Sequence, residues 1–390
     1  MRPWVGIAGL VAGTAIGASM LALPLEVSHY GLLGGSLLLL LSWLLMYLTS
    51  LFTLEVTTAF SPGTHWVMMA KQLFGKTTAS VIWLAYLLLL YSLLAAYLTA
   101  MAGWLNHVWH IPSWGAQLIW VALGILLLTL GTARVDQLNR WLFAGLIIAI
   151  GLLCLFLAHP QSITLPTLFK SASLNHVSIL MTSFGFHVII PSLYRYMPKD
   201  LGSIKRGLLL GSFVPLIFGL IWSIQVILLL PEDGQNSLAY LSQTGDIVYQ
   251  LPRLLADKLH QPSIQLLVTV FSWLALVTSF LGISLSLNDI WSDLISSGFT
   301  NRVLHFSPWL TLLPPFFFAY SYPEGFLVAL RYAAYLVVIL NGLLPCLYLL
   351  RKRSLKLPSG YQTRIHHWCI GVLALVFMVW CLWYQPFIFQ

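Results

Sequence analysis

The sequence predicts an all-α, polytopic membrane protein with about eleven transmembrane helices. Of its 390 residues, 59% are hydrophobic and only 8% are charged, whereas soluble domains carry roughly 25% charged residues. The apolar residues form continuous runs, as in 37–41 and 87–90, and not the alternating pattern of an outer-membrane barrel. This composition excludes a water-soluble enzyme, a nucleic-acid-binding domain and a disordered chain.

Each long apolar run is predicted to form a helix, because a chain in lipid must satisfy its own backbone polar groups. Pro308, Pro314 and Pro315 interrupt the ninth run, but proline is tolerated in membrane helices. We expect a single transporter-like transmembrane domain over 1–390, with the last span as an extra helix. The predicted spans lie near residues 4–29, 32–58, 78–104, 115–132, 140–158, 177–194, 207–230, 264–288, 303–320, 326–350 and 366–384.

Charge predicts how these spans are oriented. With the N-terminus in the cytoplasm, 15 of the 19 Lys and Arg residues fall on the inner side and 4 on the outer side, in agreement with the positive-inside rule. Eleven spans then place the C-terminus outside. The long outer interval 231–263 is expected to hold two short surface helices, near 237–240 and 246–260, and 290–298 a third.

The first span carries a break signal at mid-depth, formed by Gly13, Thr14, Gly17 and Ser19. Each glycine costs a helix about 1 kcal/mol relative to alanine, so local unwinding is cheap there. Unwinding frees peptide groups that must face a protein-lined cavity, where a polar ligand can pair with them. Close helix packing is the alternative, because Gly9, Gly13 and Gly17 also form a double GxxxG pattern.

The sixth span repeats this signal with Gly185 and His187 at mid-depth, and Pro191 disrupts the helix one turn on. The two spans begin the two halves of the chain if 4–158 and 177–350 are repeated units. Interrupted helices at matching places point to the central site of a transporter. Half-helix N-termini suit a carboxylate and freed carbonyls suit an ammonium group, so the predicted ligand is a zwitterion such as an amino acid.

Few ionisable residues lie at membrane depth, where charges are costly and usually functional. His187 lies beside the second break, and the unperturbed histidine pKa of about 6.5 suits proton uptake and release. A neutral histidine bonded within the bundle is the alternative. Glu26 and Glu55, near the ends of spans one and two, are further proton-coupling candidates. For each of them, pairing with a neighbouring polar group at the membrane boundary is the simpler explanation.

Three aromatic residues are candidates for contact with a substrate. Tyr91, near the middle of span three, must find a partner for its hydroxyl, either a substrate carboxylate or a neighbouring helix. Phe184 and Phe186 flank Gly185, and one of them is expected to stack on an aromatic ligand unless both serve in packing.

No metal site and no cofactor are predicted. His107 and His110 lack a third ligand nearby, and no GxxxxGK[ST] phosphate-binding motif is present. An ion gradient, most simply of protons, must therefore supply the energy for transport. The four cysteines all lie in apolar runs without zinc spacing, at Cys154, Cys346, Cys369 and Cys381.

Three runs resemble signatures of the hydroxy/aromatic amino acid permease family, within the amino acid–polyamine–organocation superfamily. Residues 13–24 read GTAIGASMLALP and resemble its first helix. Residues 182–187, TSFGFH, followed by PSLYRY at 191–196, are similar to its sixth helix. Residues 279–285, SFLGISL, are similar to its eighth. The resemblance covers most of the chain, and the tyrosine-specific permeases are the subgroup that it matches best.

This resemblance implies the leucine-transporter (LeuT-type) fold, a 5+5 inverted repeat with discontinuous helices 1 and 6. It also implies proton-coupled uptake across the bacterial inner membrane, with a periplasmic C-terminus. Some proton-coupled relatives carry a lysine in span five, and 141–158 has none, so sodium coupling stays an alternative. The residues that it places around the substrate are Gly13, Thr14, Gly17, Ser19, Phe184, Gly185 and His187, with Ser279 and Ser284 in the wall of span eight.

The sequence therefore predicts a secondary active transporter that imports an aromatic amino acid, with tyrosine as first choice. Tryptophan or another neutral amino acid is the alternative substrate. A membrane-embedded enzyme is disfavoured, because no HExxH or GxSxG run exists. A non-transporting amino-acid sensor on the same scaffold is a further class. The expected partners are a small amino acid and the lipid bilayer, not nucleic acid.

Overall fold

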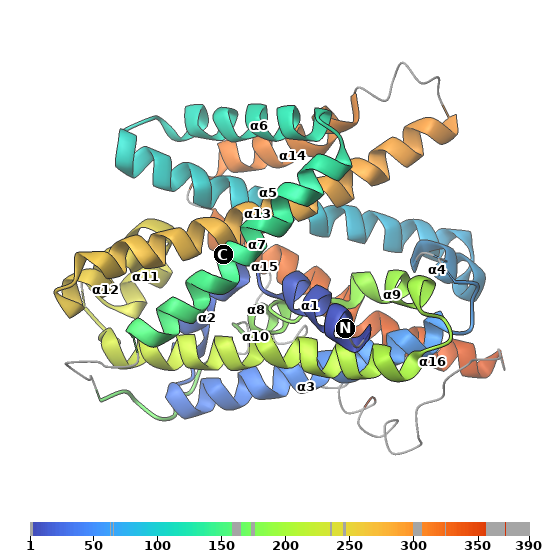
Figure 1. The fold of residues 1–390 in the computed structure, drawn as a ribbon, viewed down its shortest axis with the longest axis horizontal. Helices are drawn as coiled ribbons and strands as arrows, with labels where there is room; N and C mark the ends of the chain where they lie inside the picture. Colours follow the sequence, from blue (N-terminus) through green and yellow to red (C-terminus); the bar gives the residue numbers. More distant parts are fainter. Residues whose placement is uncertain are drawn as a thin grey trace.

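The computed structural model shows a helical fold, with no β-strand among the residues that it describes (Figure 1). Those residues are 3–62, 64, 66–157, 165–172, 176–234, 236–244, 247–298, 306–323, 325–355 and 371. Helical segments occupy the first ten predicted spans. The eleventh, near 366–384, lies outside the described residues apart from 371.

The first half of the chain contains seven helices within its described residues. They are α1 (Pro3–Ala15), α2 (Ser19–Ser28), α3 (Leu32–Thr57), α4 (Trp66–Phe74), α5 (Lys76–Trp109), α6 (Ser113–Thr129) and α7 (Thr132–Phe156). The described part of the second half contains the following elements: α8 (Val177–Thr182), η2 (His187–Ile189), α9 (Ile190–Tyr196), α10 (Leu201–Leu229), α11 (Leu238–Thr244), α12 (Ile247–Leu259), α13 (Pro262–Gly298), α14 (Ser307–Ser321), α15 (Phe326–Val337), the π-helix η4 (Val338–Leu343) and α16 (Leu344–Ser354).

Length and apolar composition identify a multi-pass membrane protein. Seven helical stretches of the described chain are long and apolar enough to cross a membrane, and the bent pair α1–α2 makes an eighth. The helices α6 and α14 are shorter, with 17 and 15 residues. The count of eleven spans therefore stays a prediction.

The first backbone amides of α3 have partners outside the helix. Gly31 precedes it with φ 78°, a conformation that favours glycine. The first amides of α3 then donate to the segment 165–172, with Leu32 bonded to the Thr167 carbonyl at 2.9 Å and Leu33 to the Leu168 carbonyl at 2.9 Å. A helix start normally leaves such amides unpaired, so this segment acts as the cap.

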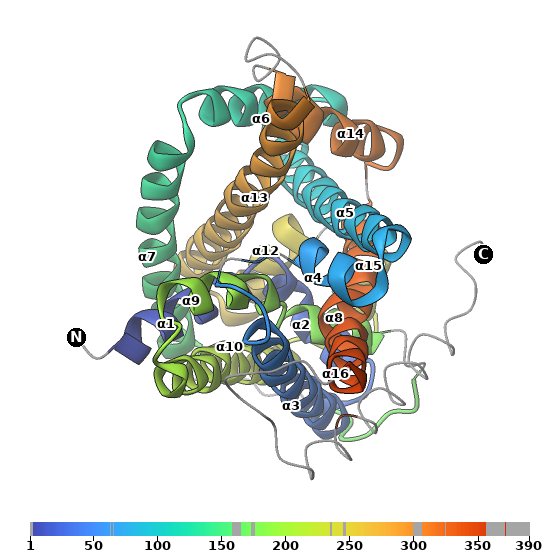
Figure 2. The same cartoon turned by 90° about the vertical axis from the view of Figure 1, so that its right-hand side faces the viewer.

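The short helices α2 and α8 lie inside a ring of longer helices that includes α3, α5, α10, α13 and α15 (Figure 2). In the packing, α2 contacts α3, α8 and α10, and α8 contacts α2, α3 and α15. One half of each interrupted span, α2 of span one and α8 of span six, therefore lies beside the other in the centre of the bundle.

Glycines do mediate close helix packing, but on α10 and not through the Gly9 of the GxxxG pattern in α1. A Cβ atom on Gly9 would meet nothing within 4 Å. On α10, a Cβ atom at Gly211 would lie 2.6 Å from the Ala8 carbonyl oxygen, and one at Gly207 would overlap Ile7. These two glycines, four residues apart, let α1 lie directly against α10.

The connecting segments agree with prediction in one place and differ in two. The helices α11 and α12 occupy the outer interval where two short helices were predicted. The prediction of a separate helix near 290–298 was wrong, because α13 runs from Pro262 to Gly298. It has no proline in its interior and no glycine between 283 and 297 that would end the helix. The helix α4, between spans two and three, was not predicted.

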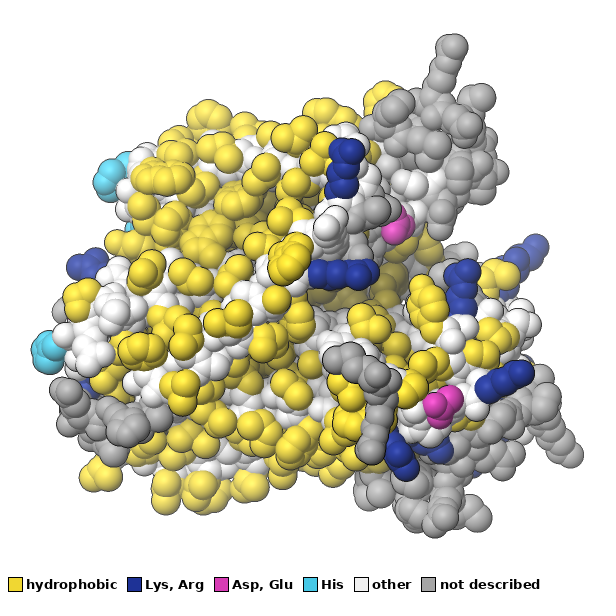
Figure 3. Space-filling view, viewed as in Figure 1, with side chains coloured by type: hydrophobic (Ala, Val, Ile, Leu, Met, Phe, Trp, Pro, Cys, Tyr) yellow, Lys and Arg dark blue, Asp and Glu magenta, His cyan; other side chains and the backbone are white. Residues whose placement is uncertain are grey.

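The surface separates apolar and basic side chains (Figure 3). Hydrophobic side chains cover the broad face over α7, α10 and α13. Lys and Arg side chains gather toward the right-hand side of that view, where α7 and α10 begin (Figures 1 and 3). The basic residues of these two helix starts were all assigned to the inner side from the sequence; they are Arg134, Arg140, Lys205 and Arg206.

Candidate functional site

The first span is broken where its glycines predicted. The helix α1 ends at Ala15, α2 begins at the buried Ser19, and the two axes are bent by 67°. Among the described residues, no backbone partner exists for the amides of Gly17 and Ala18, and no side chain caps α2. Unpaired amides at a helix N-terminus carry partial positive charge, so this break is suited to an anionic group such as a carboxylate.

A polar wall from two other helices faces this break. A Cβ atom on Gly17 would lie 2.7 Å from the Oγ atom of Ser279 on α13. The hydroxyl of Tyr97 on α5, a buried residue, lies close enough to Ser279 to interact with its hydroxyl. A side chain at position 17 would therefore displace the Ser279 hydroxyl, and Ser279 and Tyr97 bring two hydroxyl groups to the break.

Gly13 and Thr14 lie at the end of α1, and each has a structural partner of its own. A Cβ atom on Gly13 would lie 3.1 Å from the ring of Phe143 on α7. The hydroxyl of Thr14 donates to the Leu10 carbonyl at 2.7 Å, and the side chain is exposed. At the break, these two residues offer their backbone carbonyls. In a continuous helix, those carbonyls would accept from the amides of Gly17 and Ala18.

The sixth span is broken as well. The helix α8 ends at Thr182, residues 183–186 are non-helical, and the chain resumes through η2 and α9. Asn341 in the π-helix η4 lies beside this second break, because its Nδ2 atom is 3.6 Å from the position of a Cβ atom on Gly185. An amide side chain thus faces the one residue of the break that has no side chain.

His187, at the start of η2, is fully buried and bonded to α3. Its Nε2 atom lies 2.9 Å from the Oγ1 atom of Thr49, and this hydroxyl donates to the Met46 carbonyl at 3.1 Å. Since a hydroxyl has one proton, Nε2 is assigned as the donor to Thr49. The Nδ1 atom is then a bare acceptor, and it has no hydrogen-bond partner within the described residues.

Two further hydroxyl oxygens are buried without a hydrogen-bond partner among the residues that the structure describes. They belong to Ser183, in the second break, and to Ser284 on α13. Most buried polar atoms in proteins are hydrogen-bonded to protein or water, so unpaired ones mark places where a ligand or water is expected. Together with Nδ1 of His187, they give the region unused hydrogen-bonding capacity.

The three aromatic candidates all contact neighbouring protein groups in the structure, and substrate contact by Phe184 or Phe186 stays a prediction. Phe184 and Phe186 are both fully buried, and the ring of Phe186 stacks on that of His187 at 5.3 Å. The hydroxyl of Tyr91 donates to the Leu310 carbonyl of α14 at 2.7 Å and accepts from the indole of Trp291. Tyr91 therefore bonds neighbouring helices, which was the second partner expected for it, and Tyr97 takes its place at the break.

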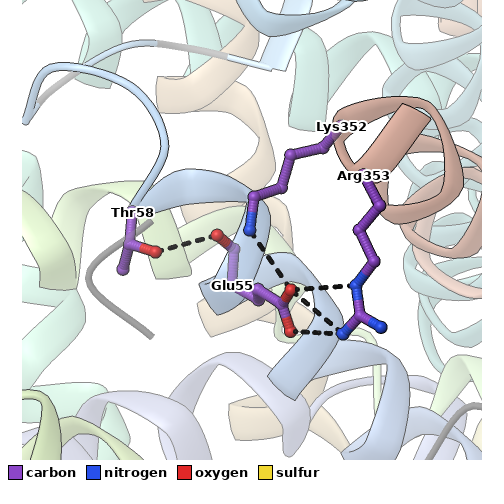
Figure 4. A network of polar contacts seen from close by, with 4 residues as sticks. All are labelled: Glu55, Thr58, Lys352 and Arg353. Atoms are coloured by element: carbon purple, nitrogen blue, oxygen red, sulfur yellow. Dashed lines mark hydrogen bonds and ion pairs between the residues drawn. The ribbon is translucent and has the colours of Figure 1, made fainter. Parts of the chain in front are cut away.

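Both carboxylate candidates are paired with basic groups, as the simpler explanation predicted. Glu26 on α2 lies 2.6 Å from the Nδ1 atom of His176. Glu55, at the other end of the molecule, is fully buried and bonded to Lys352 and Arg353 at 3.2 Å each (Figure 4). The second pairing ties α3 to the end of α16.

Sequence reasoning missed Thr49, Tyr97 and Asn341. Asn341 had a signal, because it is followed by Gly342 and then by Pro345 inside an apolar run. Thr49 had a weaker one, as part of a hydroxyl-rich stretch that continues to Thr58. Tyr97 had no sequence signal that distinguished it from the other tyrosines of its span.

Two interrupted helices that lie side by side within a helical membrane bundle define a multi-pass membrane protein with a central polar site. Residues 2–384 match the model of the tryptophan/tyrosine permease family, and the chain belongs to this family. Membership confirms the resemblance seen in the sequence and identifies a transport protein rather than an enzyme.

Three relatives cover nearly the whole chain. Tyrosine-specific transport system 1 of Haemophilus influenzae is 31% identical, and the match covers 96% of both chains. Tyrosine-specific transport system 2 of the same organism is 32% identical and covers 99% of this chain and 96% of the relative. Its tryptophan-specific transport protein is 27% identical, over 95% of this chain and 93% of the relative.

Proposed function

We propose that this permease is a secondary active transporter that imports an aromatic amino acid, with tyrosine as its substrate. The observation that carries the proposal is the pair of helix breaks on adjacent segments, one of which presents the free amides of Gly17 and Ala18. Tyrosine is chosen over tryptophan because the two tyrosine-specific relatives are 31% and 32% identical, against 27% for the tryptophan-specific one.

The amino acid backbone and the side chain of the substrate are assigned to different groups of residues. The free amides at the start of α2 receive the carboxylate, and the freed carbonyls at the end of α1 receive the ammonium group. The hydroxyl groups of Tyr97 on α5 and Ser279 on α13 supply further hydrogen-bonding groups for the substrate at the first break. The proposed binding residues are Gly13, Thr14, Gly17, Ser19, Tyr97, Phe184, Gly185, His187, Ser279 and Ser284.

Protons are the proposed coupling ion, and His187 is the proposed carrier. Its Nδ1 atom is buried with a free lone pair beside the second break, so it can accept a proton that a neighbouring substrate carboxylate would stabilise. The carboxylates of Glu26 and Glu55 are already held by basic partners, which makes them weaker carriers. Sodium is the alternative coupling ion, and the experiment must distinguish sodium coupling from proton coupling.

Transport follows from rocking of one set of helices against another around the two breaks. We place the protein in the bacterial inner membrane, as the resemblance to its family implies. The distribution of its basic residues supports a cytoplasmic N-terminus and a periplasmic C-terminus. The fold proposed for this motion is a leucine-transporter type inverted repeat, with residues 4–158 and 177–350 as its two halves.

The test is uptake of labelled tyrosine, tryptophan and phenylalanine into proteoliposomes, with proton and sodium gradients imposed separately. We expect accumulation of tyrosine that depends on the proton gradient. His187→Ala should lower gradient-driven uptake more than tyrosine exchange, since exchange needs no net proton movement. Absence of uptake under either gradient would overturn the transport proposal, and equal loss of uptake and exchange would remove His187 as the carrier.

A further inference from the structure

Three side chains that can bind a metal meet where α2 ends. Glu26 lies on α2, His29 directly follows it, and His176 precedes α8. One donor atom from each lies within 4.8 Å of the other two. The Glu26 carboxylate is 2.6 Å from Nδ1 of His176, and the two imidazole rings are stacked with centroids 3.8 Å apart.

The donor atoms of this cluster are shielded, and one of them is unused. Glu26 is only 1% exposed. The Nε2 atom of His29 is buried and has no hydrogen-bond partner among the residues described by the structure. A buried imidazole nitrogen without a partner is uncommon, and here it lies beside a carboxylate and a second imidazole. That combination is the donor set of a metal site.

We propose that Glu26, His29 and His176 bind a divalent transition-metal ion, with Zn²⁺ as the best match. Two imidazole nitrogens and one carboxylate oxygen are ligands that zinc prefers, at about 2.0–2.2 Å each. Magnesium and calcium require six or more oxygen ligands, which this cluster does not offer. Three protein ligands leave a fourth position for water. The proposal does not depend on the transport function.

Two positive charges near the cluster limit its affinity. Arg331 on α15 and Lys170 are close enough for their charges to act on His29. Lys170 is neutralised by Glu232, with Nζ and Oε2 2.8 Å apart. The positive charge of Arg331 also acts on His29. We therefore expect binding at micromolar metal concentrations and not the tighter binding of a structural zinc site.

A bound ion would join two segments that are far apart in the chain. Glu26 and His29 belong to the half of span one that follows its break, and His176 begins the half of span six that precedes its break. The sequence did not predict this site, because 147 positions separate His29 from His176. The metal would fix the outer halves of the two interrupted segments to one another.

The experiment measures metal binding to the full-length protein in detergent. Co²⁺ replaces Zn²⁺ as a visible probe, because its absorption bands report tetrahedral nitrogen and oxygen ligands. Zn²⁺ is then titrated in competition, and thermal unfolding is followed with and without it. We expect one ion per chain, a tetrahedral Co²⁺ spectrum and a higher unfolding temperature with Zn²⁺, since an ion that binds the native state stabilises it.

His29→Gln is the decisive variant, because it removes one ligand and leaves the bond between Glu26 and His176 intact. We expect its affinity for Zn²⁺ to fall by at least about 100-fold, since even second-shell changes at metal sites cost 10–100-fold. His107→Gln, at an exposed histidine on α5, is the control and should bind like the wild type. Wild-type protein that binds no Co²⁺, or a His29→Gln variant that binds Zn²⁺ unchanged, would overturn the proposal. Neither readout involves amino acid uptake.

Discussion

His187 and Thr49, which are 138 positions apart in the chain, are joined by a buried hydrogen bond of 2.9 Å between Nε2 and Oγ1. This bond fixes the imidazole of a broken helix against an unbroken one. It also assigns the imidazole proton to Nε2, because the threonine hydroxyl donates its own proton to the Met46 carbonyl and can only accept from the histidine. The free Nδ1 atom of His187 is a consequence of this arrangement.

Thr49→Val should lower tyrosine uptake about tenfold at low substrate concentration. The substitution keeps the volume but removes the hydroxyl that is bonded to the buried His187, and loss of a buried hydrogen-bond partner costs about 1–3 kcal/mol. Initial rates over a range of tyrosine concentrations give KM and the maximal rate. Thr49→Ser should retain activity. Thr53→Val is the matched control, because the Thr53 hydroxyl lies one turn along α3 and is bonded only to the Thr49 carbonyl in the described structure. An equal loss there would point to general damage of α3.

Gly17→Ala should abolish tyrosine binding, because its Cβ atom would lie 2.7 Å from Ser279 Oγ at the break. Gly9→Ala, where a Cβ atom meets nothing within 4 Å, should behave like the wild type. The double variant Gly17→Ala, Ser279→Ala should recover part of the uptake, since the next atom of residue 279 is 3.9 Å away. A double variant as inactive as Gly17→Ala alone would mean that the contact with Ser279 is not the cause.

Glu55→Gln should destabilise the protein by about 3–5 kcal/mol, because it leaves the buried ammonium of Lys352 without its counter-charge. The side chain of Lys352 is 2% exposed and that of Glu55 is fully buried. Thermal or denaturant unfolding in detergent measures the change. Asp257→Asn breaks an exposed pair with Arg253, of 3.9 Å, and should cost less than about 1 kcal/mol. Similar losses in the two variants would contradict a buried ion-pair role for Glu55.

Acidification should weaken the contacts that Glu232 makes with Lys170 and Thr167. Burial raises the pKa of this carboxyl, but hydrogen bonds from Lys170 and Thr167 together lower the pKa by a larger amount. The net pKa therefore lies below its ordinary value of 4.5. A depressed carboxyl pKa stabilises the native state above the unfolded-state pKa, and the stabilisation is lost as pH falls through the native one. The unfolding temperature of the wild type should therefore drop more than that of Glu232→Gln as the pH is lowered from 7 to below the native pKa of Glu232. Parallel curves would exclude these contacts as a source of acid sensitivity.

The positions of the helices and of the two breaks were predictable, because they depend on local properties of the chain. Apolar runs of sufficient length must become helices in lipid, and clustered glycines lower the cost of ending one. The interruption between Ala15 and Ser19 and the one after Thr182 lie where the glycine and hydroxyl residues predicted them.

Contacts between distant segments were not predictable, because they depend on how whole helices pack. Nothing near Tyr97 in the sequence distinguishes it from Tyr91, yet only Tyr97 faces Ser279. In the same way, only the packing of α1 on α10 shows that Gly207 and Gly211 are the glycines at which these two helices come close together.

The sequence by itself determined that this chain is a helical membrane protein of a permease family with two interrupted spans, since hydropathy and helix-breaking residues act over one or two turns. The tertiary structure alone decided which side chains meet at those interruptions. Thr49 beside His187, and His176 beside Glu26 and His29, are brought together by helices that begin more than a hundred residues apart. Such meetings arise from packing of side chains between helices, which the spacing of residues along one helix does not encode.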